Sequence, residues 1–260
     1  MKDDYIEFID HIMGKTGIDL KLYKERQMKR RITSLRNKRG YGDFKVYFKA
    51  MEKDEELLTE FIDRITINVS EFYRNPKRWL VLKETILPSL LKKKQNTPLT
   101  IWSAACSTGE EPYSMAIMLN EYFPNTSFQI IATDIDEKAL EKAKLGNYQK
   151  QALKEVPAPL KEKYFTDKDD FYSVKPFLKQ YITYKKHNLL NDTYPKNVDL
   201  IICRNVLIYF TDEAKEFIYN HFAEALRTEG ILFVGSTEQI FNPAKYQFRL
   251  MDTFFYQKSL

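Results

Sequence analysis

The chain has 260 residues, of which 43% are hydrophobic, and a net charge of +5. Two cysteines without a CxxC pair and three scattered histidines argue against a disulfide framework and against a structural zinc site. No apolar run approaches the roughly 20 residues of a membrane span, and the acidic, amphipathic start is not typical of a signal peptide, so we expect a cytoplasmic protein.

Residues 1–65 predict a small domain of four helices. Apolar side chains recur at helical spacing in "DYIEFIDHIM", "LYKERQMKRRITSLRNKRG", "DFKVYFKAMEK" and "DEELLTEFIDRITI". Gly40 is a plausible helix end and Asp43 a plausible N-cap. Residues 21–49 carry eleven Lys and Arg against two acids, a net charge of +9, which leaves −4 for the rest of the chain. This asymmetry favours an acidic partner for the N-terminal part.

Residues 66–98 predict a linker that is partly helical and interrupted at Pro88. From residue 99 onward, short apolar runs alternate with helical patterns, as in "LTIWSA", "FQIIATDID", "VDLIICRN" and "GILFVGS". Runs without strict alternation are typical of strands buried on both faces, so residues 99–260 predict a doubly wound, Rossmann-like α/β domain. The less regular segment near 169–187 predicts a small β-insert.

The first strand, loop and helix of this domain, "IWSAACSTGEEPYSMAIML", indicate a ligand site. The loop has one glycine, Gly109, and two acids at the start of the following helix, which would repel a pyrophosphate. Asp134 ends the second strand, where a carboxylate can accept hydrogen bonds from ribose hydroxyls. A ribose without phosphate, next to a positive charge, describes S-adenosylmethionine. The alternative is that Asp134 only caps the next helix.

Cys106, in the middle of the loop, raises the question of a thiol nucleophile. Such a nucleophile needs a base and a group that orients the base, and His187 is the only histidine at a suggestive place. One loose pair is weak support, so we interpret Cys106 as a small loop residue and Cys203 as a core residue.

Six segments of the chain, in order, resemble the motifs of the CheR-type chemotaxis receptor methyltransferases. They are "RITINVSEFYRN", "IWSAACSTGEEPYSMAI", "ATDIDEKALEKAKLGNY", "KHNLL", "DLIICRNVLIYF" and "LFVGSTE". This family transfers a methyl group from S-adenosylmethionine to glutamate side chains on the cytoplasmic helices of chemoreceptors. The resemblance therefore implies a protein-glutamate O-methyltransferase whose other product is S-adenosylhomocysteine.

The resemblance also implies roles for individual residues. Arg74 would pair with the methionyl carboxylate, Glu111 would face the charged methionyl end, and Asp134 would hold the ribose. The remaining cofactor-binding residues would be Asn68, Ser70, Asn188, Leu189, Arg204 and Asn205. Tyr209 would lie close to the acceptor and, with Arg74, is a candidate catalytic residue. Taken without the resemblance, Asn68 and Ser70 read as turn residues and Tyr209 as a core aromatic.

The segment "KERQMKRRITSLRNKR" predicts a basic helix. In the family, this helix contributes to docking on acidic receptor helices. The predicted docking residues are Arg26, Lys29, Arg30 and Arg36. The alternative without a function is that this basic face is simply solvated. Binding of nucleic acid is disfavoured because the helix lacks interleaved aromatic residues. We expect a monomer that is recruited to receptor arrays, with no metal, no nucleic acid and no membrane insertion. A methyltransferase of RNA or a small molecule and a non-catalytic cofactor-binding module are the alternatives.

Overall fold

The computed structural model describes residues 4–92, 94 and 97–259, so residues 93, 95 and 96 of the predicted linker lie outside the described residues. The chain divides into two compact units. Unit 1 comprises Met1–Asn68 and Val206–Ile218, and unit 2 comprises Val69–Asn205 and Tyr219–Leu260. Within the described ranges there is no helix long and apolar enough to cross a membrane.

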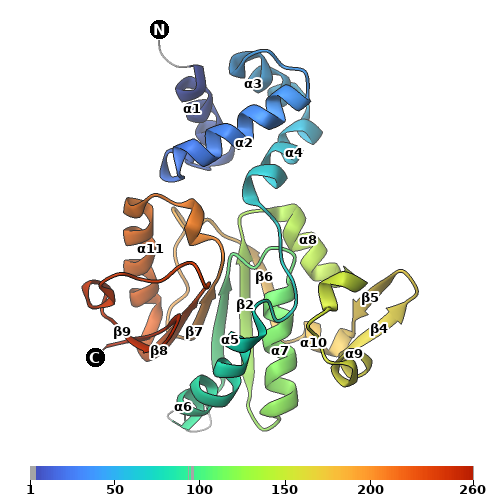
Figure 1. Cartoon of the computed structure of the whole chain (residues 1–260), viewed down its shortest axis with the longest axis vertical. Coiled ribbons are helices and arrows are strands. Elements are labelled where there is room, and N and C mark those ends of the chain that lie inside the picture. The colour runs from blue at the N-terminus through green and yellow to red at the C-terminus, as the bar shows by residue number, and fades with distance from the viewer. Residues whose placement is uncertain (1–3, 93, 95–96, 260) are drawn as a thin grey trace. The chain divides into compact units, whose positions relative to one another are not determined.

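Unit 1 contains the four predicted helices, which are confirmed (Figure 1). Their bounds are α1 (Asp4–Thr16), α2 (Glu25–Lys38), α3 (Phe44–Lys53) and α4 (Glu55–Thr66), with a 3-10 turn η1 (Leu20–Leu22) before α2. The side chain of Asp43 accepts a hydrogen bond from the Val46 N–H at 2.7 Å, the expected N-cap. Gly40 follows α2 with a left-handed φ of 79°, the expected helix end. Phe8, Tyr47 and Phe61 pack in the core.

The second segment of unit 1 directly follows a strand of unit 2 in sequence. It contains the 3-10 helix η4 (Leu207–Tyr209) and the first part of α11 (Asp212–Ala225). The Lys24 N–H donates to the Tyr209 carbonyl at 2.8 Å, and the Thr211 N–H donates to the Leu22 carbonyl at 2.9 Å. This segment therefore pairs with the chain between η1 and α2, which the predicted boundary at residue 65 does not anticipate.

Unit 2 is built on a seven-stranded sheet with the order β6-β2-β1-β7-β8-β10-β9. The first five strands run parallel, and β10 lies antiparallel between β8 and β9. The bounds are β1 (Leu99–Ala104), β2 (Phe128–Asp134), β6 (Ile182–Lys186), β7 (Val198–Cys203), β8 (Leu226–Val234), β9 (Phe248–Asp252) and β10 (Phe255–Lys258). After β1 the chain adds β2 and then β6 on one side of β1, and it then adds β7 and β8 on the other side. The direction in which strands are added therefore reverses between β1 and β7. Ligands of such sheets bind beyond the carboxyl ends of the strands at this point.

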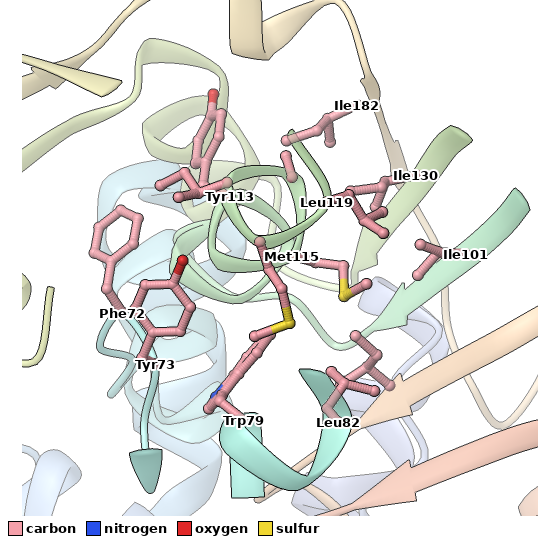
Figure 2. Packing of buried hydrophobic residues seen from close by; sticks show 14 of the residues in the cluster. Phe72, Tyr73, Trp79, Leu82, Ile101, Tyr113, Met115, Leu119, Ile130 and Ile182 are labelled. Carbon is pink, nitrogen blue, oxygen red and sulfur yellow. The ribbon is translucent and has the colours of Figure 1, made fainter. Parts of the chain in front are cut away.

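Both faces of the sheet are covered, as a doubly wound fold requires. Figure 2 shows Ile101 of β1 in a buried cluster with Met115 and Leu119 of helix α7 (Glu110–Tyr122). The next residue, Trp102, points to the other face and packs on Phe222 of α11, with ring centroids 5.5 Å apart. The predicted fold class is therefore confirmed.

Other helices surround this sheet. Their bounds are α5 (Pro76–Val81), the π-helix η2 (Leu82–Ile86), α6 (Leu87–Lys92) and α8 (Glu137–Leu145). The predicted interruption at Pro88 takes the form of this π-helical stretch, after which α6 continues through the proline. A wider turn accommodates the missing N–H and the ring of the proline without ending the helix.

A second, three-stranded antiparallel sheet has the order β3-β5-β4. Its elements are β3 (Asn147–Gln149), η3 (Lys150–Leu153), α9 (Ala158–Tyr164), β4 (Phe165–Lys168) and β5 (Phe171–Val174), followed by α10 (Pro176–Lys179). We call it the small sheet. The predicted insert at 169–187 is wrong in its bounds, because residues 182–186 form β6, which pairs with β2 in the main sheet. In a half-exposed strand at a sheet edge, apolar and polar residues alternate as they would in a strand of a separate small sheet. The pattern therefore does not reveal which sheet the strand joins.

Candidate functional site

The loop between β1 and α7 makes a sharp turn at the carboxyl ends of β1 and β2. Ala105, Ser107 and Gly109 all have left-handed φ angles, of 62°, 50° and 95°. The Cys106 N–H donates to the Thr133 carbonyl of β2 at 2.8 Å. We call residues 105–109 the cofactor loop. Its small side chains permit these backbone angles, and its hydrogen bond to β2 holds the turn in place at the predicted ligand site.

Asp134, at the end of β2, lies under this loop. Its Oδ2 accepts a hydrogen bond from the Ser107 N–H at 2.7 Å, and its Oδ1 accepts one from the Asp136 N–H at 3.0 Å. Burial raises the pKa of Asp134 to about 6, although these hydrogen bonds act in the opposite direction. The capping interpretation of Asp134 is wrong, because it is Asp136 whose side chain caps α8. The Asp134 carboxylate keeps acceptor positions that ribose hydroxyls could use.

Two carboxylates begin helix α7, Glu110 buried and Glu111 partly buried. Glu110 accepts hydrogen bonds from the Thr108 hydroxyl at 2.7 Å and from the Ser70 hydroxyl, while burial raises its pKa. Glu111 accepts a hydrogen bond from the Ser103 hydroxyl at 2.7 Å, and burial raises its pKa to about 7. The structure thus brings Ser70 and Glu111, two predicted cofactor residues, to the same end of one helix.

Arg204 follows β7 and faces these acids. Its Nη1 lies 3.9 Å from the Glu111 carboxylate, and its Nη2 donates to the Arg74 carbonyl at 2.8 Å. The guanidinium lies over the Phe233 ring, 4.8 Å from the centroid, and its Nε has no hydrogen-bond partner among the described residues. Burial lowers the pKa of Arg204, and the nearby Glu111 charge opposes this shift. Such a buried cation with an unused donor suits an anionic or carbonyl group of a ligand.

Arg74 approaches the same charges from the segment before α5. Its Nη1 donates to the Val69 carbonyl at 2.9 Å, and its carbonyl accepts a hydrogen bond from the Trp79 indole at 3.2 Å. Its positive charge lowers the pKa of Glu111 and that of Arg204. Arg74 is only partly buried, so its guanidinium can reach a ligand.

The chain after β6 passes beside Asp134. The His187 N–H donates to the Asp134 carbonyl at 2.9 Å, which places Asn188 and Leu189 at the same edge of the sheet. The Asn188 side chain accepts a hydrogen bond from the Leu190 N–H at 2.9 Å, and the Leu189 carbonyl accepts one from Tyr194 at 2.5 Å. Both of these predicted cofactor-binding residues thus lie in a tightly bonded turn.

Glu238 is a site residue that the predictions did not include. Its Oε2 accepts hydrogen bonds from the Asn205 N–H at 2.6 Å and the Gly235 N–H at 2.8 Å. It thereby joins the carboxyl ends of β7 and β8 and holds Asn205, whose φ is 62°, in a left-handed conformation. A Cβ at Gly235 would clash with this carboxylate oxygen, so only glycine fits here. The signal was present in "LFVGSTE", where an acid follows a glycine at the end of a strand.

The thiol of Cys106 is not arranged as a nucleophile. The residue is 2% exposed, and burial together with the charge of Asp134 raises the pKa of the thiol well above its usual range. His187 packs edge-on against Trp102, with centroids 5.4 Å apart. Nowhere in the described part of the chain do three or more His, Cys, Asp or Glu side chains gather as metal ligands would.

Two of the predicted cofactor-binding and catalytic residues belong to unit 1. Asn68 donates from Nδ2 to the Thr66 hydroxyl at 3.3 Å. Tyr209 lies in η4, and the guanidinium of Arg31, from α2, lies over its ring at 5.7 Å from the centroid. Arg31 also donates to the Ile65 carbonyl at 3.2 Å. The docking prediction omitted Arg31, which faces inward from the basic helix.

The four predicted docking residues on α2 differ in their surroundings. Lys29 lies over the Tyr5 ring at 4.9 Å, and Arg36 lies over the Phe44 ring at 4.4 Å. Arg26 and Arg30 are exposed, and neither takes part in an ion pair between described residues. These two are therefore the side chains most available to an acidic partner.

Comparison with known proteins covers nearly the whole chain. Residues 3–66 match the CheR methyltransferase all-alpha domain, and residues 68–255 match the CheR methyltransferase SAM binding domain. A chemotaxis protein methyltransferase of Listeria monocytogenes is 45% identical over 259 residues, which cover 100% of this chain and 98% of that protein. One from Borreliella burgdorferi is 36% identical over 251 residues, covering 92% and 89%. A chemotaxis protein methyltransferase 2 of Vibrio cholerae is 30% identical over 246 residues, covering 91% and 85%.

Proposed function

This chain belongs to the CheR methyltransferase family, and on that premise we propose that it methylates glutamate side chains of chemotaxis receptors with S-adenosylmethionine. The observation that carries the proposal is the buried Asp134 carboxylate, bonded to the cofactor loop at the reversal of the strand order. A family model for S-adenosylmethionine binding covers this same region. The products would be a glutamyl methyl ester and S-adenosylhomocysteine.

The residues of unit 2 fit the parts of this cofactor. Asp134 would accept hydrogen bonds from the ribose hydroxyls, and Asn188 and Leu189 would border the adenine. Glu111 would face the methionyl amino group, whose positive charge compensates a carboxylate that burial otherwise disfavours. Arg74 would pair with the methionyl carboxylate. Ser70, Arg204 and Asn205 would complete the pocket in unit 2. The resemblance also implies a cofactor role for Asn68, a residue of unit 1.

The proposed reaction makes modest chemical demands on the protein. The acceptor glutamate has an ordinary pKa of about 4.3, so it is ionised at neutral pH and attacks without a general base. S-adenosylmethionine supplies a methyl group that its sulfonium already activates. The protein must therefore align the two reactants and keep water away from them. A catalytic triad is not required for this displacement.

Arg74 and Tyr209 are the residues that we propose for alignment. Tyr209 is held by its backbone at Lys24 and by the Arg31 guanidinium over its ring. The proposed acceptor-side tyrosine and the proposed docking helix α2 thus belong to one packed unit. Binding of a receptor helix to α2 would then act on the same structural unit that carries Tyr209.

The exposed charges of α2 support an acidic partner. Arg26 and Arg30 have no acid to neutralise them within the described chain, and residues 21–49 concentrate a net charge of +9. Acidic helices of a receptor would complement this surface and be steered to it. Ionic strength should weaken such docking because exposed charges are screened by salt.

Transfer of labelled methyl from S-adenosylmethionine to chemoreceptor-containing membranes tests the proposal. We expect base-labile label on the receptor, lost when the acceptor glutamates are changed to alanine. Methyl label that is found on RNA, and that stays on the nucleotides after treatment with base, would instead assign the chain to a different class of methyltransferase. Cofactor binding with no label on any acceptor would favour a non-catalytic signalling module.

A further inference from the structure

Tyr148 occupies the centre of β3 in the small sheet. Its side chain is buried, with 5% of the residue exposed. The ring packs edge-on against Phe72, with centroids 4.9 Å apart, and against Tyr113 at 6.2 Å. These contacts leave the ring one orientation, with its hydroxyl directed at the cofactor loop.

The hydroxyl of Tyr148 donates a hydrogen bond to the Thr108 carbonyl at 2.7 Å. Thr108 directly precedes Gly109, which turns the chain into α7 with a φ of 95°. A Cβ on Gly109 would lie 2.9 Å from the Tyr148 oxygen and 2.7 Å from the Ala143 Cβ. The tyrosine therefore both bonds the loop and occupies the space into which the loop could otherwise shift.

The other side of the cofactor loop is bonded to β2. The Ser107 N–H donates to the Asp134 carboxylate, and the Cys106 N–H donates to the Thr133 carbonyl. The loop is thus held from the main sheet on one side and from the small sheet on the other. Without the Tyr148 hydroxyl, the partly buried Thr108 carbonyl would lose this partner, and an acceptor shielded from water without a partner favours rearrangement of the backbone.

We propose that Tyr148 is a positioning residue that preorganises the cofactor loop, so that the small sheet and the cofactor site are energetically coupled. The inference rests on the proposed function only in taking the ligand of this loop to be S-adenosylmethionine or its product. A loop ordered before binding lowers the entropic cost of ligand binding. Coupling between two sites is reciprocal, so a bound cofactor also stabilises β3.

The first test compares S-adenosylhomocysteine binding by calorimetry for the wild-type chain, Tyr148→Phe and Tyr172→Phe. Tyr172 is a matched control because it lies opposite Tyr148 in the strand register, while its own hydroxyl interacts with Asp167. Loss of one hydrogen bond should raise the Kd of Tyr148→Phe by about 3- to 10-fold. The control should stay within about twofold of wild type. Equal Kd values for all three proteins would overturn the proposal.

Amide hydrogen exchange distinguishes coupling between β3 and the cofactor site from a role of Tyr148 in fold stability alone. In the wild-type chain and in Tyr172→Phe, S-adenosylhomocysteine should slow amide exchange in residues 147–149 and 171–174, and in Tyr148→Phe it should not. A wild-type chain that binds the ligand without slower exchange in β3 would overturn the proposal even if Tyr148→Phe did not fold. A wild-type chain that does not bind S-adenosylhomocysteine at all would instead contradict the proposed function.

Discussion

Glu111→Gln should make the ligand-free protein more stable at pH 8 and, at the same time, weaken cofactor binding. Burial raises the pKa of Glu111 from 4.5 to about 7, and each unit of pKa corresponds to about 1.4 kcal/mol. The ionised carboxylate therefore lowers the free energy of unfolding at pH 8 by roughly 3 kcal/mol relative to a neutral side chain. The attraction of Arg204 is already contained in this value, because it lowers the pKa.

The sign of the pH dependence follows from the raised pKa. Between pH 4.5 and about 7 the folded protein holds a proton on Glu111 that the unfolded chain has released. This contribution to stability is fully present below about pH 4.5 and is lost as the pH rises through about 7. Glutamine carries no such proton, so the gain of Glu111→Gln over wild type should be largest at pH 8 and fall below about 1 kcal/mol at pH 5.

Thermal unfolding followed by circular dichroism measures this difference. In a domain of this size, 1 kcal/mol shifts the Tm by about 2–4 °C, so Glu111→Gln should raise it by roughly 6 °C or more at pH 8. Glu141→Gln, at an exposed position in α8, is the matched control and should change the Tm little at either pH. An equal gain in Tm for Glu111→Gln at pH 5 and pH 8, or a lower Tm than wild type at pH 8, would show that burial does not raise the pKa of this carboxylate.

Four further predictions concern the loop, the thiol and the acceptor side. Charge reversal at Arg26 and Arg30, the two exposed docking candidates, should raise the receptor KM by roughly tenfold and leave the cofactor KM nearly unchanged; equal effects on both would argue against docking. Tyr209→Phe should slow methyl transfer by about tenfold with unchanged S-adenosylhomocysteine binding in calorimetry, and a wild-type rate would show that the hydroxyl has no role. Cys106→Ala should keep the rate of methyl transfer within about threefold of wild type, because the displacement needs no thiol. Complete loss of activity in a folded protein would instead indicate that Cys106 is a nucleophile. Gly109→Ala should weaken S-adenosylhomocysteine binding by roughly tenfold or more, since its φ of 95° and a contact of 2.7 Å disfavour a Cβ, and wild-type affinity would contradict this.

The parts of the fold that local patterns determine were predictable from the sequence. The run "LTIWSA", the small-residue loop after it and Asp134 at the end of the next strand all lie where expected. Each depends on side chains within a few residues, where apolar periodicity and turn chemistry act directly. Asp43 as a helix cap is predictable for the same reason.

Edge strands were less predictable because their sequences do not require burial on both faces. Residues 182–186 form β6 of the main sheet, whereas the same pattern suggested a strand of an insert. Residues 248–252 form β9, whose three middle side chains are exposed, and no apolar run marked it. Membership of a strand in one sheet or another depends on pairing with distant residues.

The same reason limits prediction of the site. Glu238 reaches Asn205 across 33 positions in sequence, and Tyr148 reaches Thr108 across 40. Tyr209 lies in a segment that packs with the N-terminal helices, far from it in the chain. Residue type and local spacing identify candidates such as Asp134 and Glu111, but bonds between distant loops emerge only from the three-dimensional arrangement.

Mass spectrometry of peptides from a chemoreceptor cytoplasmic domain, incubated with the full chain and S-adenosylmethionine, tests whether receptor glutamates accept the methyl group. We expect glutamate side chains that gain the mass of one methylene group and lose it in mild base, with the gain strongly reduced for Asp134→Asn. An unmodified receptor, in the presence of a wild-type chain shown to bind S-adenosylmethionine, would contradict the assignment of receptor glutamates as the acceptor.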